Sequence, residues 1–154
     1  LDVANFTKYV EEKGPLEAGS ILETYQTIVS KATRMHGGSE ISRVGDGHIL
    51  LFSGPLAAIR TALELLENIM DHPYMKSLSQ ILKIRAAIGL HTDVLSPNKK
   101  SQVEKVLKVL YPDEIGLTES AAQNIVPGTF EEGTLNQTSR KGVTFFQVNE
   151  LAEV

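Results

Sequence analysis

Two aspartates stand at predicted turns, and each has the surroundings of a metal ligand. Asp46 lies between Gly45 and Gly47, in a turn that leaves a carboxylate pointing outward. Asp2 stands just before a turn into the helical segment TKYVEEK, where free helix amides follow an acid. Carboxylate oxygens suit Mg²⁺, so each aspartate is a candidate metal ligand, and the Asp2 segment could form a magnesium-polyphosphate cradle. The plainer alternatives, Asp46 as a turn former and Asp2 as a helix cap, stay open on local grounds.

Other reactive residue types form no comparable pattern. The four histidines show no metal-ligand spacing, and each is expected at the surface or in a loop: His36, His48, His72 and His91. The sequence has no cysteine, which excludes disulfides and thiolate metal sites. It also lacks the motifs of phosphate-binding loops, serine hydrolases and zinc proteases.

Composition indicates one ordinary globular domain over residues 1–154. The chain is 42% hydrophobic and 22% charged, and no window is apolar enough to span a membrane. We expect no membrane contact by this domain and a cytoplasmic location. The net charge of −4 argues against nucleic-acid binding. Because Leu1 is not a natural start, the N-terminal strand is expected to be truncated.

The apolar pattern predicts the elements that position the two aspartates. Helical spacing favours helices from Pro15 to Gly37, from Pro55 and over about 101–110, with a short helix at 119–125. Strands are predicted at 39–44 and 48–52 around the glycine turn, and at 81–92, 114–118 and 142–148, with a loop at 71–80. Alternating helices and strands with one hairpin predict a mixed sheet.

Five segments in order resemble the catalytic domain of class III adenylate/guanylate cyclases. They are Asp2–Thr7 (D-I-x-G-F-T in the family), Met35–Gly38 (x-H-G-G), Val44–Phe52 (the I-G-D-A hairpin), Ile88–Thr92 (I-G-I-H-T) and Asp113–Ala121 (G-E-I…S-E-S-A). The likeness covers nearly the whole chain. It implies a ferredoxin-like α/β sandwich whose mixed, mainly antiparallel sheet is covered by helices.

The resemblance also implies a binding site for a nucleoside triphosphate with Mg²⁺ or Mn²⁺. By analogy with the family, the metal ligands are Asp2, the backbone of Val3, and Asp46. The backbone amides that would cradle the phosphates are those of Asn5, Phe6 and Thr7.

Several positions depart from the family pattern. Ser42 stands where the family has a base-reading lysine, and its neighbour Arg43 is expected to face the opposite side of the sheet. Asn98 aligns with the second base-reading residue. Ser101 and Lys105 fall at the positions of the transition-state asparagine and arginine, and lysine lacks the bidentate fork of arginine.

The segment 93–100 is shorter than the β-hairpin arm of the family and is predicted to be an exposed loop, which makes the family homodimer doubtful. We therefore expect a degenerate cyclase homology domain that binds metal weakly. It would act as a regulatory or interaction module with a protein partner or a neighbouring signalling domain. The alternatives are an active cyclase that uses ATP or GTP and an unrelated ferredoxin-like ligand-binding domain.

Overall fold

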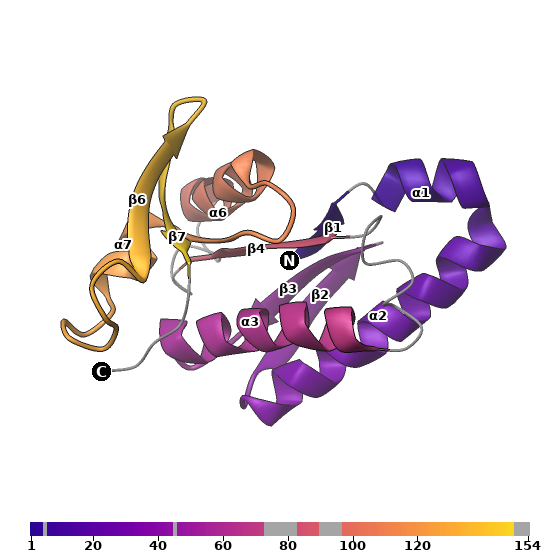
Figure 1. Ribbon diagram of the computed structural model, residues 1–154, viewed down its shortest axis with the longest axis horizontal. Helices are drawn as coiled ribbons and strands as arrows, with labels where there is room; N and C mark the ends of the chain where they lie inside the picture. The colour runs from indigo at the N-terminus through magenta and orange to yellow at the C-terminus, as the bar shows by residue number, and fades with distance from the viewer. Residues whose placement is uncertain (5, 45, 73–82, 90–96, 150–154) are drawn as a thin grey trace.

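A computed structural model describes residues 1–4, 6–44, 46–72, 83–89 and 97–149 (Figure 1). The elements in chain order are β1 (Asp2–Ala4), α1 (Phe6–Lys13), α2 (Pro15–Met35), β2 (Ser39–Val44), β3 (Gly47–Leu51), α3 (Pro55–Asp71), β4 (Lys83–Ile88), α6 (Pro97–Val109), β5 (Ile115–Leu117), α7 (Glu119–Gln123), β6 (Leu135–Arg140) and β7 (Val143–Val148). Within these residues no helix is long and apolar enough to cross a membrane.

The sheet is mixed and mainly antiparallel, as expected. Five strands lie in the order β1-β4-β5-β7-β6, and only β4 and β5 run parallel. The β2–β3 hairpin joins β1 through its inner strand, because Leu1 and His48 exchange backbone hydrogen bonds of 2.9 and 3.3 Å. The first four strands therefore follow the order β2-β3-β1-β4, which is the ferredoxin-like arrangement.

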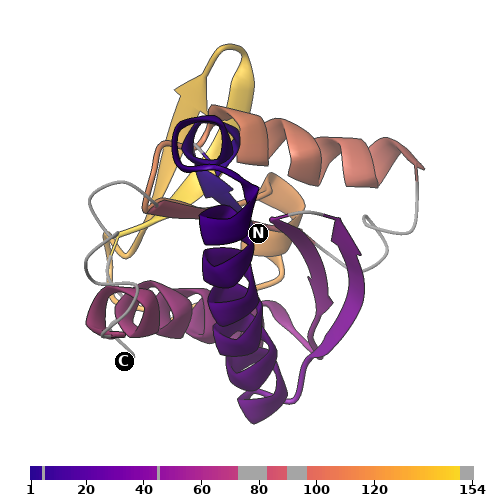
Figure 2. The same ribbon diagram turned by 90° about the vertical axis from the view of Figure 1, so that its right-hand side faces the viewer.

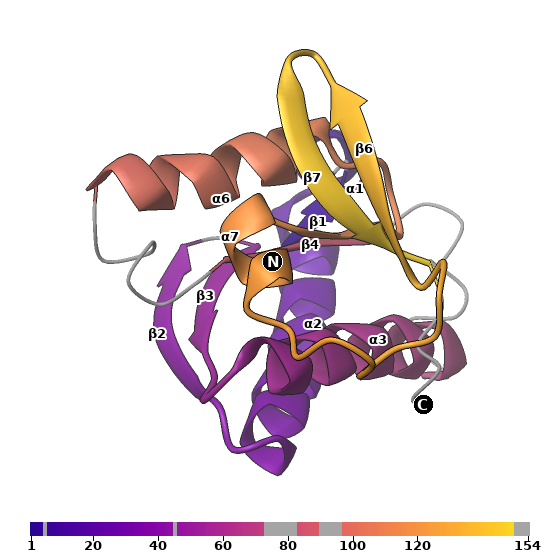
Figure 3. The same cartoon turned by 90° about the vertical axis from the view of Figure 1, so that its left-hand side faces the viewer.

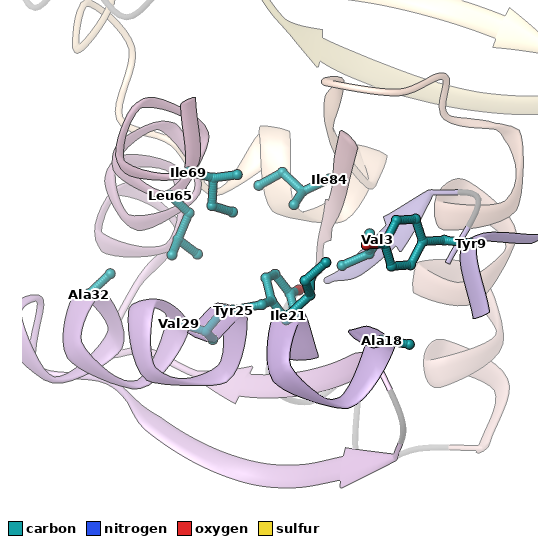
Figure 4. Packing of buried hydrophobic residues seen from close by; sticks show 10 residues of the cluster. All are labelled: Val3, Tyr9, Ala18, Ile21, Tyr25, Val29, Ala32, Leu65, Ile69 and Ile84. Carbon is teal, nitrogen blue, oxygen red and sulfur yellow. The ribbon is translucent and has the colours of Figure 1, made fainter. Parts of the chain in front are cut away.

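The two long helices α2 and α3 lie together along one face of this sheet (Figures 1 and 2). Pro15 and Pro55 occupy the first turns of these helices, where a missing amide hydrogen costs nothing. The predicted apolar stripe of α2 is buried against β1, β4 and α3, and Figure 4 shows its side chains meeting Val3, Ile84 and Leu65. This packing holds β1 and β4 against the two helices.

Helix α6 covers the opposite face of the sheet, where it packs on β4, β5 and β7 (Figures 1 and 3). Val106 and Leu110 pack on Phe145, which is completely buried. This close approach depends on Gly116 of β5, where an added Cβ would lie 2.9 Å from a Leu110 methyl and 3.1 Å from a Val106 methyl.

Two sequence expectations about elements are wrong. Residues 97–100 were predicted as loop but form the first turn of α6, because proline suits the first turn of a helix as well as a loop. Strand β6 was not predicted, since its sequence LNQTSR is polar and lies at the edge of the sheet. Most of the loop predicted at 71–80 and the ends of the strand predicted at 81–92 lie outside the described residues.

Candidate functional site

The side chain of Asp46 accepts a hydrogen bond that a backbone carbonyl would normally accept between two antiparallel strands. After the Leu1–His48 pair, the next pair in the antiparallel register is Val3 with Asp46. There the Val3 amide donates to the side-chain oxygen Oδ2 of Asp46 at 3.0 Å. The hairpin turn is thus joined to β1 by a carboxylate, and Asp2 lies next to Val3 on the same strand.

The Asp2 carboxylate is held by Arg85 on β4. The two residues are direct register partners, so their side chains point to the same face of the sheet. Arg85 donates from Nε to Oδ1 at 2.9 Å and from Nη2 to Oδ2 at 2.7 Å. The side chains are only 20% and 24% exposed for Asp2 and Arg85, respectively. The face is the one opposite α2 and α3, because Val3 and Ile84 point into the helical core.

As arranged, these residues fit one guanidinium rather than two divalent ions. Both oxygens of Asp2 already face a cation, and one oxygen of Asp46 accepts from Val3. In the part of the chain that the structure describes, no group of three or more acidic, histidine or cysteine side chains is placed to hold a metal. The expectation of weak Mg²⁺ or Mn²⁺ binding stays a prediction.

The expected phosphate-binding segment begins α1. Phe6 and Thr7 are the first residues of this helix, directly after β1, so their amides lie at its N-terminus. The Phe6 side chain packs against the core, and Thr7 is exposed. Asn5 lies outside the described residues.

Ser42 and Arg43 point to opposite faces, as the strand period requires. Ser42 pairs with Ile49 in register and lies on the face away from α2. Arg43 lies on the α2 side, where it donates to Gln26 at 3.1 Å and to Ser30 at 3.5 Å. The Arg43 guanidinium therefore binds side chains of α2, on the face of the hairpin opposite to Ser42.

The remaining expected site residues lie on α6. Asn98 and Ser101 belong to its first half, and Lys105 is exposed in its second half. The helix packs on β4, β5 and β7. The structure brings Asp2, Val3 and Asp46 together, and Lys105 lies exposed on α6.

A buried polar layer lies beneath the site, between β3 and α2. His48, expected at the surface, is buried: its side chain is fully enclosed, because it faces α2 and packs edge-on against the Tyr25 ring at 5.3 Å. Its Nδ1 lies 2.9 Å from Glu40, and burial lowers the pKa of the imidazole despite that carboxylate. Burial, with the charges of Asp46, Asp2 and Glu40, raises the pKa of Tyr25.

The sequence interpretation missed Arg85. The available signal was a charged residue between Ile84 and Ala86, inside a strand whose other residues after Lys83 are apolar. Such a residue needs a partner when half-buried. Its partner became visible only when the strand register set it opposite Asp2.

The chain is similar in fold to several solved structures of nucleotide cyclase domains. The guanylate cyclase domain of RhGC from Catenaria anguillulae, in complex with GTP, is 14% identical and has a TM-score of 0.76 over 98% of this chain and 93% of that chain. The guanylyl cyclase Cya2 is 16% identical, with a TM-score of 0.72 over 99% and 90% of the two chains. The adenylyl cyclase CyaB from P. aeruginosa is 17% identical, with a TM-score of 0.66 over 98% and 91%.

No protein-family model and no curated protein matches the sequence. At these identities the structural comparison establishes the fold: the chain has the architecture of the class III adenylyl and guanylyl cyclase catalytic domain. The ferredoxin-like α/β sandwich expected from the five motif segments is thereby confirmed.

Proposed function

We propose that this chain is a nucleotide-cyclase-type domain that does not cyclise nucleotides and serves as a regulatory or interaction module in signalling. The observation that carries the proposal is that both aspartates are hydrogen-bonded within the chain: Asp2 accepts from Arg85, and Asp46 accepts from the Val3 amide. An acid already neutralised by arginine is a poor ligand for a catalytic metal, because the two cations repel each other.

Other positions that depart from the family pattern support the same proposal. Ser42 offers a hydroxyl at the expected base-reading position, and Arg43 is held on the other face by α2. Lys105 carries a point charge where a planar fork would be needed to bind two oxygens of one phosphate. Loss of one preorganised donor to a developing negative charge typically lowers a rate by about 10²–10³.

The test is direct measurement of cyclic nucleotide. Purified chain is incubated with Mn²⁺ and either ATP or GTP, and cAMP and cGMP are quantified by mass spectrometry against a blank of metal and nucleotide. We expect no product above the blank. Product formed by the unchanged chain and abolished by Asp46→Asn would show an active cyclase, which is the alternative function.

A further inference from the structure

We infer that Arg85 sets the metal affinity of this site: its guanidinium acts as an internal cation on Asp2, and a divalent ion binds tightly only when that pair is removed. The inference rests on the proposed function and deepens it, because it names the residue that keeps the site out of use. It concerns binding, so it is tested without any measurement of turnover.

The pair is built into the sheet rather than formed by chance at the surface. Asp2 and Arg85 are opposite each other on antiparallel strands, so the backbone brings both side chains to one face. The two parallel hydrogen bonds, 2.9 and 2.7 Å long, have the bidentate geometry that only arginine provides. With side chains 20% and 24% exposed, the pair is also less screened by salt than a surface pair.

Charge explains why the pair opposes a metal ion. Arginine keeps its proton at every pH that a folded protein tolerates, so the positive charge beside Asp2 is permanent. A divalent ion on the same carboxylate would lie a few ångströms from that charge, in a partly buried environment where repulsion is strong. Asp46 would also have to give up the Val3 amide or share the oxygen that accepts from it.

The experiment compares Mn²⁺ affinity in four forms of the full chain, by electron paramagnetic resonance of free Mn²⁺. These are the unchanged chain, Arg85→Gln, Arg85→Gln with Asp46→Asn, and Arg34→Gln. We expect Arg85→Gln to bind Mn²⁺ on the order of 10–100-fold more tightly than the unchanged chain, the range by which groups beside a metal ligand alter affinity. Adding Asp46→Asn should abolish the gain.

Arg34→Gln is the matched control. Arg34 is an exposed arginine in the last turn of α2 whose side chain donates to the Ser30 carbonyl, so its loss changes the net charge equally at another position. We expect its Mn²⁺ affinity to equal that of the unchanged chain. Equal tightening in this control would overturn the inference, because net charge alone would explain the effect.

A measurement on the unchanged chain covers the case in which Arg85→Gln fails to fold. In an amide NMR titration, the Val3 signal should persist at equimolar Mn²⁺ and disappear only with a large excess of the ion, whereas Ser139 on the distant strand β6 serves as the reference signal. Complete loss of the Val3 signal at equimolar Mn²⁺ with Ser139 retained would overturn the inference, as would a folded Arg85→Gln that binds no more tightly. Cyclic nucleotide production by the unchanged chain would instead overturn the proposed function and leave this comparison intact.

Discussion

Arg140 makes several polar and ring contacts at the opposite end of the sheet from Asp2. Its guanidinium donates to both oxygens of Glu114 and to the Val109 carbonyl, and it stacks on the Tyr111 ring at 3.9 Å. Burial alone would raise the pKa of Glu114. The hydrogen bonds from Arg140 and from the Tyr111 amide outweigh that effect and lower this pKa below its usual value. These contacts fix the turn between α6 and β5.

The depressed pKa of Glu114 makes a prediction about pH. Because the unfolded carboxyl has a pKa of about 4.3 and the folded one a lower value, the pair stabilises the fold above the unfolded pKa. That stability is lost as pH falls through the folded pKa. We expect Glu114→Gln to lower the free energy of unfolding by about 2 kcal/mol at pH 7, measured by urea titration. The difference should shrink below about pH 4; a difference independent of pH would contradict this reasoning.

At the scale of elements, the contact between α6 and the sheet depends on a glycine in β5, Gly116. Gly116 lies under Leu110 and Val106, with too little room for a methyl group. We expect Gly116→Ala to lower the free energy of unfolding by about 1–3 kcal/mol, the usual cost of overpacking. Urea denaturation followed by circular dichroism measures it.

The same substitution in α2 is the control. Gly19 has open space around its added Cβ and lies within a helix, so Gly19→Ala should stabilise the protein by up to about 1 kcal/mol. The two glycine-to-alanine substitutions should therefore change the free energy of unfolding in opposite directions. An unchanged free energy of unfolding for Gly116→Ala would contradict the prediction, because it would mean that α6 can move away from β5 without loss of stability.

Elements with strong apolar periodicity were predictable, and polar ones were not. Helix α2 and the hairpin strands follow from residue spacing and from proline and glycine positions. Strand β6 shows no such pattern, because it is a half-exposed edge strand whose partner is set by the neighbouring β7. Local turn chemistry singled out the two aspartates of the candidate site, and only the resemblance to the cyclase family joined them into one site. Arg85 was not found, because its role depends on a register between residues far apart in sequence.

At the scale of the whole molecule, we expect the chain to be monomeric. Helix α6 begins at Pro97, so only residues 89–96 connect it to β4, and a short connection leaves little chain for a projecting arm. Sedimentation velocity at micromolar concentration measures this, and a single species at the mass of 16.8 kDa is the expected result. A stable dimer at those concentrations would contradict the expectation.

The bond between Asp46 and Val3 also changes what a motif search can conclude about chains of this kind. Because Asp46 completes the pairing of two strands, folding alone gives a reason for an acceptor at that turn, whether or not the chain turns over nucleotide. Persistence of the Gly-Asp-Gly signature is then no evidence of a working enzyme. The residue that faces Asp2 across the sheet is the further one to examine, and in this chain it is Arg85, which binds both oxygens of that carboxylate.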